Sequence, residues 1–259
     1  MTTVQVWRRL LIVSLAIAAM ILVLGRAAEL IFIGTTDSSA RERAIRTIQT
    51  KAADLATELA RVTVGLSERA EVKSAMGGDP SAVRRLFEIL ESASGTDLNT
   101  NSSITVFDTD GTPIAWSGRP SEWDAELLRA GTMRFAEGSS AGLRVIHVEP
   151  VADQSHENSS RATERLGSIV SEGVFSPTVP DLESGEEFVI DTTVGRVIVR
   201  PVEDGVTPKV DSVAVIDLDG KPAIEAVISP EEIAGTRLLW RARVVALSLF
   251  SLAISTFWA

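Results

Sequence analysis

The sequence predicts a membrane-anchored α+β protein, in which a long helix packs on an antiparallel sheet between two flanking transmembrane helices. Uncharged apolar runs lie near both ends of the 259-residue chain, and helical and strand patterns lie between them. The acidic residues are concentrated in that interior. Residues 35–236 hold 34 Asp and Glu against 19 Lys and Arg, a net charge of −15, which is typical of a soluble domain.

The composition excludes several classes of function. A formal net charge of −10 lacks the basic surface that nucleic-acid binding requires. The absence of cysteine rules out disulfides, thiolate metal sites and a cysteine nucleophile, and two histidines are too few for a His-rich metal site. No motif for a serine hydrolase, a zinc protease or a phosphate loop occurs. We therefore expect no catalytic residue, metal, cofactor or nucleic-acid partner for the residues present.

The first apolar segment predicts a transmembrane helix. Residues 7–25 match the roughly 20 helical residues that a bilayer core requires. Trp7 suits the interfacial belt, and Arg8 and Arg9 can reach the headgroups. A cleaved signal peptide has the same basic start and apolar run, so this alternative stays open.

The two arginines favour a cytoplasmic amino terminus, since positive charges are retained on that side of the membrane. We therefore assign residues 1–34 to the cytoplasmic start and the first span, and residues 35–236 to an extracytoplasmic domain. Membrane lipid is then the first expected partner of the chain.

A second apolar run covers residues 244–259. Sixteen helical residues extend roughly 24 Å, which is less than a bilayer core of about 30 Å. We expect residues 237–259 to begin a second transmembrane helix in a truncated chain, with a tail anchor as the alternative. Arg237, Arg241 and Arg243 lie at its outer end and oppose the positive-inside rule locally, although long loops cross membranes largely regardless of charge.

Apolar residues at alternating spacings of three and four predict a long helix over residues 45–66. The stripe consists of Ile45, Ile48, Ala52, Leu55, Leu59, Val62 and Leu66. Such a seam suits a homodimer in which the helix pairs with its copy. The same spacing suits a helix laid along its own sheet, and the two arrangements are compatible.

The remaining elements are predicted from caps, turns and alternation. Asp79 and Pro80 are typical of a helix start, and Gly95 of its end. A capping pair, Ser121 and Asp124, predicts a short helix through Leu128. Alternating and β-branched runs predict strands over residues 104–107, 113–116, 143–151, 166–175, 188–191, 196–200, 213–216 and 223–228.

The motif Asp-x-Asp-Gly occurs twice, at residues 108–111 and 217–220, each time after a strand pattern. Asp-Gly supplies the positive φ angles of a tight hairpin. The glycine comes too early for a calcium-binding EF-hand loop, so we expect hairpins and no metal. The recurrence fits two related sheet units and equally fits chance reuse of a common turn.

One segment has the residues of a small-ligand site. Trp116, Ser117 and Arg119 follow one another at the end of a strand, and Trp123 lies seven residues beyond the first tryptophan. Aromatic rings with one guanidinium could bind a small carboxylate. The alternative is that both tryptophans pack in the core or at its rim and that Arg119 is solvated.

The stretch Phe107-Asp-Thr-Asp-Gly followed by Ala115-Trp-Ser-Gly-Arg119 resembles the extracytoplasmic Cache-like (PAS-like) sensor region of bacterial membrane histidine kinases. The order of elements over roughly residues 1–175 is also similar. The resemblance implies a fold in which the long helix packs on a Cache/PAS-like sheet. It implies a ligand-sensing module of a two-component system in the bacterial inner membrane, with an unknown small ligand near Trp116–Arg119.

The chain departs from such kinases in lacking a phosphoacceptor helix and a nucleotide-binding domain. Kinase activity is therefore not expected in these residues and is left open for a longer protein. Two other interpretations remain, a sensor-like domain ahead of further membrane helices and a tethered interaction or structural domain of the envelope.

Overall fold

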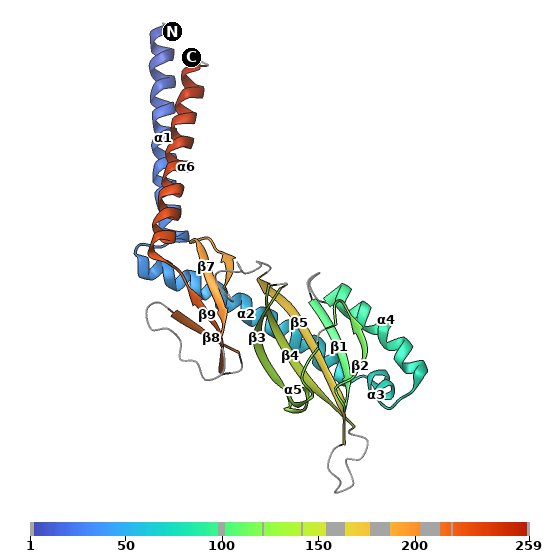
Figure 1. Cartoon of the computed structure of the whole chain (residues 1–259). Helices are drawn as coiled ribbons and strands as arrows, with labels where there is room; N and C mark the ends of the chain where they lie inside the picture. Colours follow the sequence, from blue (N-terminus) through green and yellow to red (C-terminus); the bar gives the residue numbers. More distant parts are fainter. Residues whose placement is uncertain are drawn as a thin grey trace. The chain divides into compact units, whose positions relative to one another are not determined.

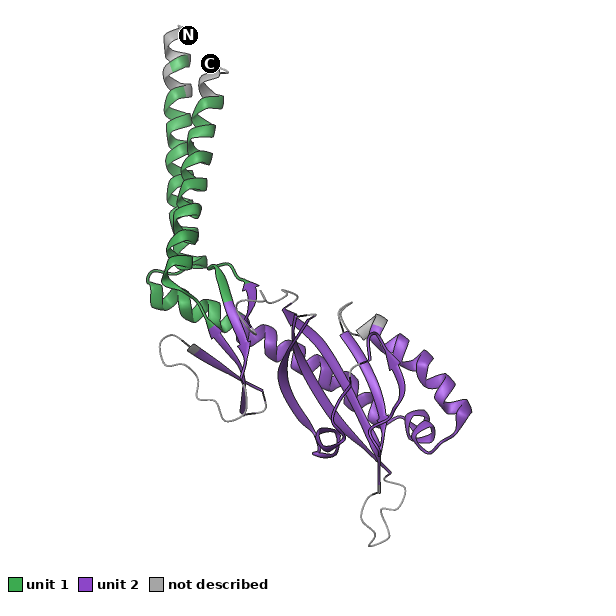
Figure 2. Cartoon of the chain, viewed as in Figure 1, with its two compact units in different colours: residues 1–47, 191–197, 227–259 green, residues 48–190, 198–226 purple. Residues whose placement is uncertain are grey.

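The computed structural model describes residues 3–97, 102–120, 122–140, 142–153, 164–176, 187–202, 213–218 and 220–257. The chain forms two compact units, drawn in different colours in Figure 2. Unit 1 comprises residues 1–47, 191–197 and 227–259, and unit 2 comprises residues 48–190 and 198–226.

Helices and strands are largely segregated along the chain, as is typical of an α+β fold (Figure 1). The helices are α1 (Thr3–Phe32), α2 (Asp37–Ser67), α3 (Ala70–Met76), α4 (Pro80–Asp97), α5 (Ala125–Arg129) and α6 (Pro230–Phe257). The strands are β1 (Ser102–Asp108), β2 (Pro113–Ser117), β3 (Met133–Ser139), β4 (Gly142–Asp153), β5 (Glu164–Ser176), β6 (Phe188–Asp191), β7 (Arg196–Pro201), β8 (Val213–Leu218) and β9 (Lys221–Val227).

The strands form two sheets. Five of them make an antiparallel sheet in the order β2-β1-β5-β4-β3, and four make a second sheet in the order β6-β7-β9-β8. The predicted α+β class with two sheet units is therefore confirmed. Each Asp-x-Asp-Gly motif joins neighbouring strands, β1 to β2 in the first sheet and β8 to β9 in the second.

The part of α2 in unit 2 packs on one face of the five-stranded sheet. The Thr63 hydroxyl donates to Ser171 Oγ on β5 at 2.6 Å. A Cβ added to Gly173 would lie 2.7 Å from Leu55 Cδ1, so the helix approaches the strand where there is no side chain. Most of the predicted stripe is buried within the chain, at Ile48, Ala52, Leu59, Val62 and Leu66. Packing on its own sheet is observed, whereas the homodimer stays a prediction.

The opposite face of this sheet carries a separate part of the core, because successive residues of a strand point to opposite faces. Val170 lies next to Ser171 on β5 and packs beneath α5. The buried members of this cluster are Phe107, Leu128, Ile146, Val148 and Val170, and Trp123, Leu127, Met133 and Phe135 are partly buried against them. This face carries the aromatic side chains discussed below.

The predicted hairpin turn between β1 and β2 is confirmed. Asp108 Oδ1 accepts the backbone N–H groups of Asp110 at 2.9 Å and Thr112 at 2.8 Å, which closes the turn. Gly111 has a φ of +85°, and Gly220 of the second motif has a φ of +75°. Asp219 lies outside the described residues, as does Ser121 of the predicted capping pair.

Other predicted boundaries hold with small differences. Asp79 caps α4, since its Oδ1 accepts the Ser81 N–H at 2.9 Å, but the helix continues two residues past Gly95 to Asp97. Two elements were missed. α3 has seven residues, about two turns, which is too short to show a clear helical periodicity. β3 is half-buried at every residue, so its burial does not alternate between a core face and a solvent face.

Unit 1 is built on α1 and α6, which run side by side (Figure 1). Their backbones approach closely at Gly25, where an added Cβ would lie 2.4 Å from Val244 Cγ1. Trp240 Nε1 donates to the Gly25 carbonyl at 3.0 Å, and Ser248 Oγ donates to the Ala18 carbonyl at 3.3 Å. Among the described residues, α1 alone has a segment long and apolar enough to cross a membrane, Leu11–Phe32.

Replacing the turn glycines should destabilise the fold. Gly111→Val and Gly220→Val should each lower the free energy of unfolding by about 1 kcal/mol or more, because valine strongly disfavours positive φ. The effect should be larger at Gly111, whose added Cβ would lie 3.2 Å from Ala125 Cβ. Thermal and denaturant unfolding of the full chain in detergent measure both changes.

Gly65→Ala is the matched control, because Gly65 lies within α2 and an added Cβ meets no atom within 4 Å. This change should stabilise the chain by about 0.5–1 kcal/mol. Unaltered unfolding of both valine variants would contradict the hairpin geometry.

Candidate functional site

A buried carboxylate organises the α5-bearing face of the five-stranded sheet. Glu172 on β5 is 3% exposed, and its two oxygens have different partners. Trp123 Nε1 donates to Oε1 at 3.2 Å, and Arg144 Nη1 on β4 donates to Oε2 at 2.5 Å. A buried charge needs such compensation, so the positions of the indole and the guanidinium are linked to the carboxylate.

Two further side chains complete this aromatic–charged cluster, which consists of Trp123, Phe135, Glu137, Arg144 and Glu172. The Trp123 and Phe135 rings meet edge to face, with centroids 5.6 Å apart, and the Arg144 guanidinium lies 5.9 Å from the Trp123 ring centroid. Arg144 Nη2 also donates to Glu137 Oε2 at 2.9 Å. The Glu137 side chain is 44% exposed, so the cluster reaches solvent along β3. It combines aromatic rings with both signs of charge.

The structure places the sequence-predicted ligand residues in two surroundings. Trp123 belongs to the aromatic–charged cluster. Trp116 on β2 packs edge to face on Phe87 of α4, with ring centroids 5.4 Å apart. Ser117 is half-buried at the end of β2, and Arg119 is exposed. The structure thus puts one tryptophan with the charged groups and the other beside α4, and the ligand-binding role of all four residues stays a prediction.

Gly118 explains why the chain leaves β2 where it does. It has a φ of +79°, and an added Cβ would lie 2.9 Å from the Ser102 carbonyl oxygen at the start of β1. Only glycine fits this turn without strain, and the turn leads the chain from the sheet edge toward Trp123.

Glu137, Arg144 and Glu172 escaped the sequence analysis. Their one visible signal is a charged residue inside an otherwise apolar strand pattern, as in Ser-Ile-Val-Ser-Glu172-Gly-Val-Phe. That signal does not identify the partner, because β4 and β5 are paired only in the folded sheet.

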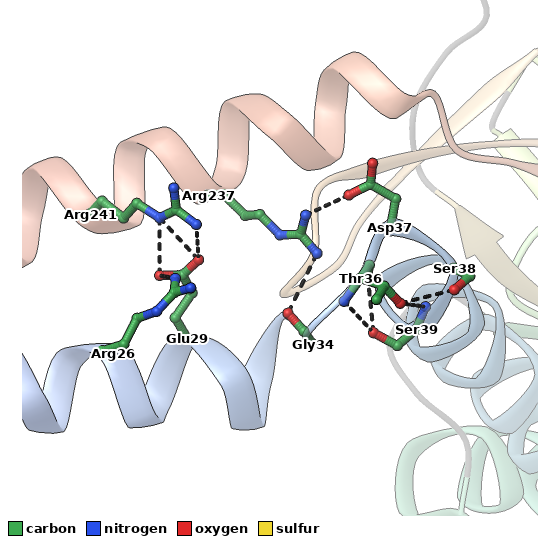
Figure 3. Close-up of polar contacts among 9 residues, drawn as sticks. All are labelled: Arg26, Glu29, Gly34, Thr36, Asp37, Ser38, Ser39, Arg237 and Arg241. Atoms are coloured by element: carbon green, nitrogen blue, oxygen red, sulfur yellow. Dashed lines mark hydrogen bonds and ion pairs between the residues drawn. The ribbon is translucent and has the colours of Figure 1, made fainter.

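A second buried carboxylate lies in unit 1, where α1 and α6 meet (Figure 3). The Glu29 side chain is 3% exposed and is held by two arginines. Arg241 on α6 donates from Nε to both carboxylate oxygens at 3.1 Å and from Nη2 to Oε1 at 2.8 Å. Arg26 on α1 donates from Nη1 to Oε2 at 2.6 Å. We call this set of three residues the Glu29 clasp.

A second ion pair joins α6 to the start of α2 (Figure 3). Arg237 Nη1 on α6 donates to Asp37 Oδ1 at the start of α2 at 2.5 Å, and Nη2 donates to the Gly34 carbonyl at 3.4 Å. The corner itself is closed by two reciprocal bonds, since the Thr36 N–H donates to Ser39 Oγ at 3.0 Å and the Ser39 N–H donates to Thr36 Oγ1 at 3.2 Å. The corner from α1 to α2 is therefore tied to α6.

The turn between β6 and β7 contacts the first turns of α6. Arg196 Nη2 donates to Glu232 Oε1 at 2.7 Å, and its Nε donates to the same oxygen at 3.2 Å. A Cβ added to Gly195 would lie 3.2 Å from Thr236 Oγ1, so the turn backbone lies directly against the helix. The side-chain hydrogen bonds from Arg196 hold the pKa of Glu232 below its ordinary value of 4.5.

No protein-family model matches this chain, and no curated protein matches it. Among solved structures, the sensor domain of the histidine kinase DctB from V. cholerae is similar, with 14% sequence identity and a TM-score of 0.44. The match covers 75% of this chain and 99% of that one.

The Glu232–Arg196 pair should make stability depend on pH. Because the folded pKa of Glu232 lies below the unfolded value near 4.5, the pair stabilises the fold above that pH. The contribution is lost as the pH falls through the folded pKa. In Arg196→Gln the carboxyl should titrate closer to 4.5, which carbon NMR of labelled glutamate measures directly.

Arg243→Gln removes the same charge from an exposed position further along α6 and should leave the Glu232 titration unchanged. A Glu232 carboxyl that titrates identically with and without Arg196 would contradict the pairing.

Proposed function

We propose that this chain is the extracytoplasmic ligand-sensing module of a membrane signalling receptor. One observation carries the proposal. The mixed α+β part is inserted between α1 and α6, and these two apolar helices pack against each other. A change within the inserted part that displaces α6 relative to α1 therefore reaches the membrane directly.

The membrane placement is supported by exposure. Apolar side chains along α1 and α6 point outward, for example Val23 at 68%, Phe250 at 63% and Leu249 at 61% exposed. Helices with this surface are stable in lipid and not in water. We propose that residues 7–25 and 237–259 lie in a bacterial inner membrane, with the amino terminus in the cytoplasm and residues 35–236 outside.

The ligand is proposed to bind unit 2. The aromatic–charged cluster around Trp123 and Glu172 combines polar and aromatic groups and reaches solvent at Glu137. Trp116, Ser117 and Arg119 stay predicted ligand residues, and Trp116 packs on Phe87 of α4 outside this cluster. A ligand shifts such a domain only if it binds one arrangement more tightly than another.

We propose that the signal passes from the four-stranded sheet to α6 through β7. β7 belongs to the four-stranded sheet, and Arg196 at its start is paired with Glu232 on α6. A shift of β7 would therefore be passed to α6 through a salt-bridged contact, and the Glu29 clasp lies two to three turns further along that helix. A histidine kinase core following α6 in a two-component system, working as a homodimer through residues 45–66, is the output that we favour.

A fusion tests this function. Residues 1–259 are joined in register to the cytoplasmic core of a histidine kinase, and its autophosphorylation is measured in membranes. Arg196→Gln and Glu29→Gln should each change the basal kinase rate by about threefold or more, since each removes a contact that sets the position of α6. Arg243→Gln is the matched control and should leave the rate unchanged.

Equal rates in all four proteins, at equal folded amounts, would contradict a signalling role. That outcome would favour a tethered interaction or structural domain of the envelope, in which the position of α6 has no consequence.

A further inference from the structure

A groove lies beside the Glu29 clasp, in unit 1. It has a volume of about 380 Å³ and is formed by one stretch of α1 and one of α6. Its wall is apolar at Leu22, Val244 and Val245, and its rim is polar at Arg26, Glu29, Trp240 and Arg241. The close approach at Gly25 brings the helices together at this level. An apolar wall below a charged rim suits a molecule with one apolar and one charged end.

The rim has a net positive charge. Two guanidinium groups share one carboxylate, so one positive charge is left over at the groove. Glu29 is buried, whereas the side chains of Arg26 and Arg241 are 55% and 56% exposed. Glu29 uses Nη1 of Arg26 and the Nε and Nη2 groups of Arg241. Within the described part of the chain, Nε and Nη2 of Arg26 and Nη1 of Arg241 have no hydrogen-bond acceptor.

The depth of the groove in the membrane narrows the choice of ligand. Under the proposed topology, Arg26 and Glu29 lie in the last two turns of the segment Leu11–Phe32, at the outer headgroup level. Trp240 lies at the same level and is bonded to Gly25, as expected for a tryptophan of the interfacial belt. The anions abundant at this depth are lipid phosphates.

We propose that this groove binds the headgroup phosphate of one anionic phospholipid, with an acyl chain against Leu22, Val244 and Val245. Guanidinium groups pair with phosphate oxygens through charge-assisted hydrogen bonds. A lipid with a net negative charge neutralises the surplus positive charge of the rim. A zwitterionic lipid does not, because its headgroup carries a positive charge beside the phosphate. The proposal rests on the membrane placement given above and adds a regulation: the lipid bridges α1 and α6 and so favours their paired state.

Lipid retention by the full chain tests the proposal. The protein is purified from nanodiscs containing equal amounts of phosphatidylglycerol and phosphatidylcholine, and bound lipid is counted by native mass spectrometry. The wild type should retain phosphatidylglycerol over phosphatidylcholine by about tenfold, the factor that one charge-assisted hydrogen bond supplies. Arg26→Gln should abolish this preference, because it removes the surplus positive charge of the rim while Arg241 keeps its pairing with Glu29.

Arg243→Gln is the matched control, since it removes the same charge from α6 at an exposed residue outside the groove lining, and it should retain the preference. Arg26→Lys should give an intermediate preference and guards against misfolding of the glutamine variant. Glycerol 3-phosphate at millimolar concentration should not displace the lipid, because it lacks the acyl chain.

Equal selectivity of the wild type and Arg26→Gln, or equal loss in Arg243→Gln, would overturn the proposal. Displacement by glycerol 3-phosphate would also overturn it and would identify a site for soluble phosphate. Retention is measured without ligand or kinase, so a failure here is distinct from a failure of the sensing function.

Discussion

A carboxylate on an apolar helix is tolerated only if a cation neutralises it, and this requirement governs the arrangement of unit 1. Glu29 is 3% exposed near the end of α1, and one arginine on its own helix supplies a single hydrogen bond. The remaining three contacts come from Arg241 on α6. The buried charge therefore specifies which helix lies beside α1 and at which level, something that apolar packing alone does not specify.

The other features of unit 1 are consistent with this constraint. Gly25 leaves room for Val244, so the two backbones approach one turn before the clasp. Arg237 ties the corner between α1 and α2 to α6 one turn away from the clasp, and Arg196 ties β7 to the start of α6. Each contact joins α6 to a different segment. A displacement of any of these segments would therefore also displace α6.

The sequence predicts the local elements well, because their signals are local. Asp108 and Gly111 form the expected hairpin, Asp79 caps its helix, and the stripe over residues 45–66 is helical. The sequence does not distinguish a dimer seam from a stripe that covers the chain's own sheet, since both place apolar residues at the same spacing of three and four. Within the subunit the stripe packs on the sheet, as the contact of Leu55 with Gly173 shows.

The candidate site is less predictable, because its groups meet across long sequence separations. Trp123 was identified from its aromatic character, but its partners Glu172 and Arg144 lie on strands whose register is set by the whole sheet. In the sequence, Glu29 and Arg241 are charged residues at the ends of the two apolar runs, and Arg241 opposes the positive-inside rule. Nothing local indicates that the two residues neutralise each other.

The pairing of α1 with α6 within one subunit, through defined facing residues, underlies the arrangement of unit 1. Cysteines at Ala18 and Ser248, which face each other in the buried seam, test it most directly in native membranes. The pairing predicts rapid formation of an intramolecular disulfide under mild oxidation. It predicts slow formation for cysteines at the outward-facing Ile17 and Leu249. Equal rates for both pairs, or cross-links only between subunits, would contradict it.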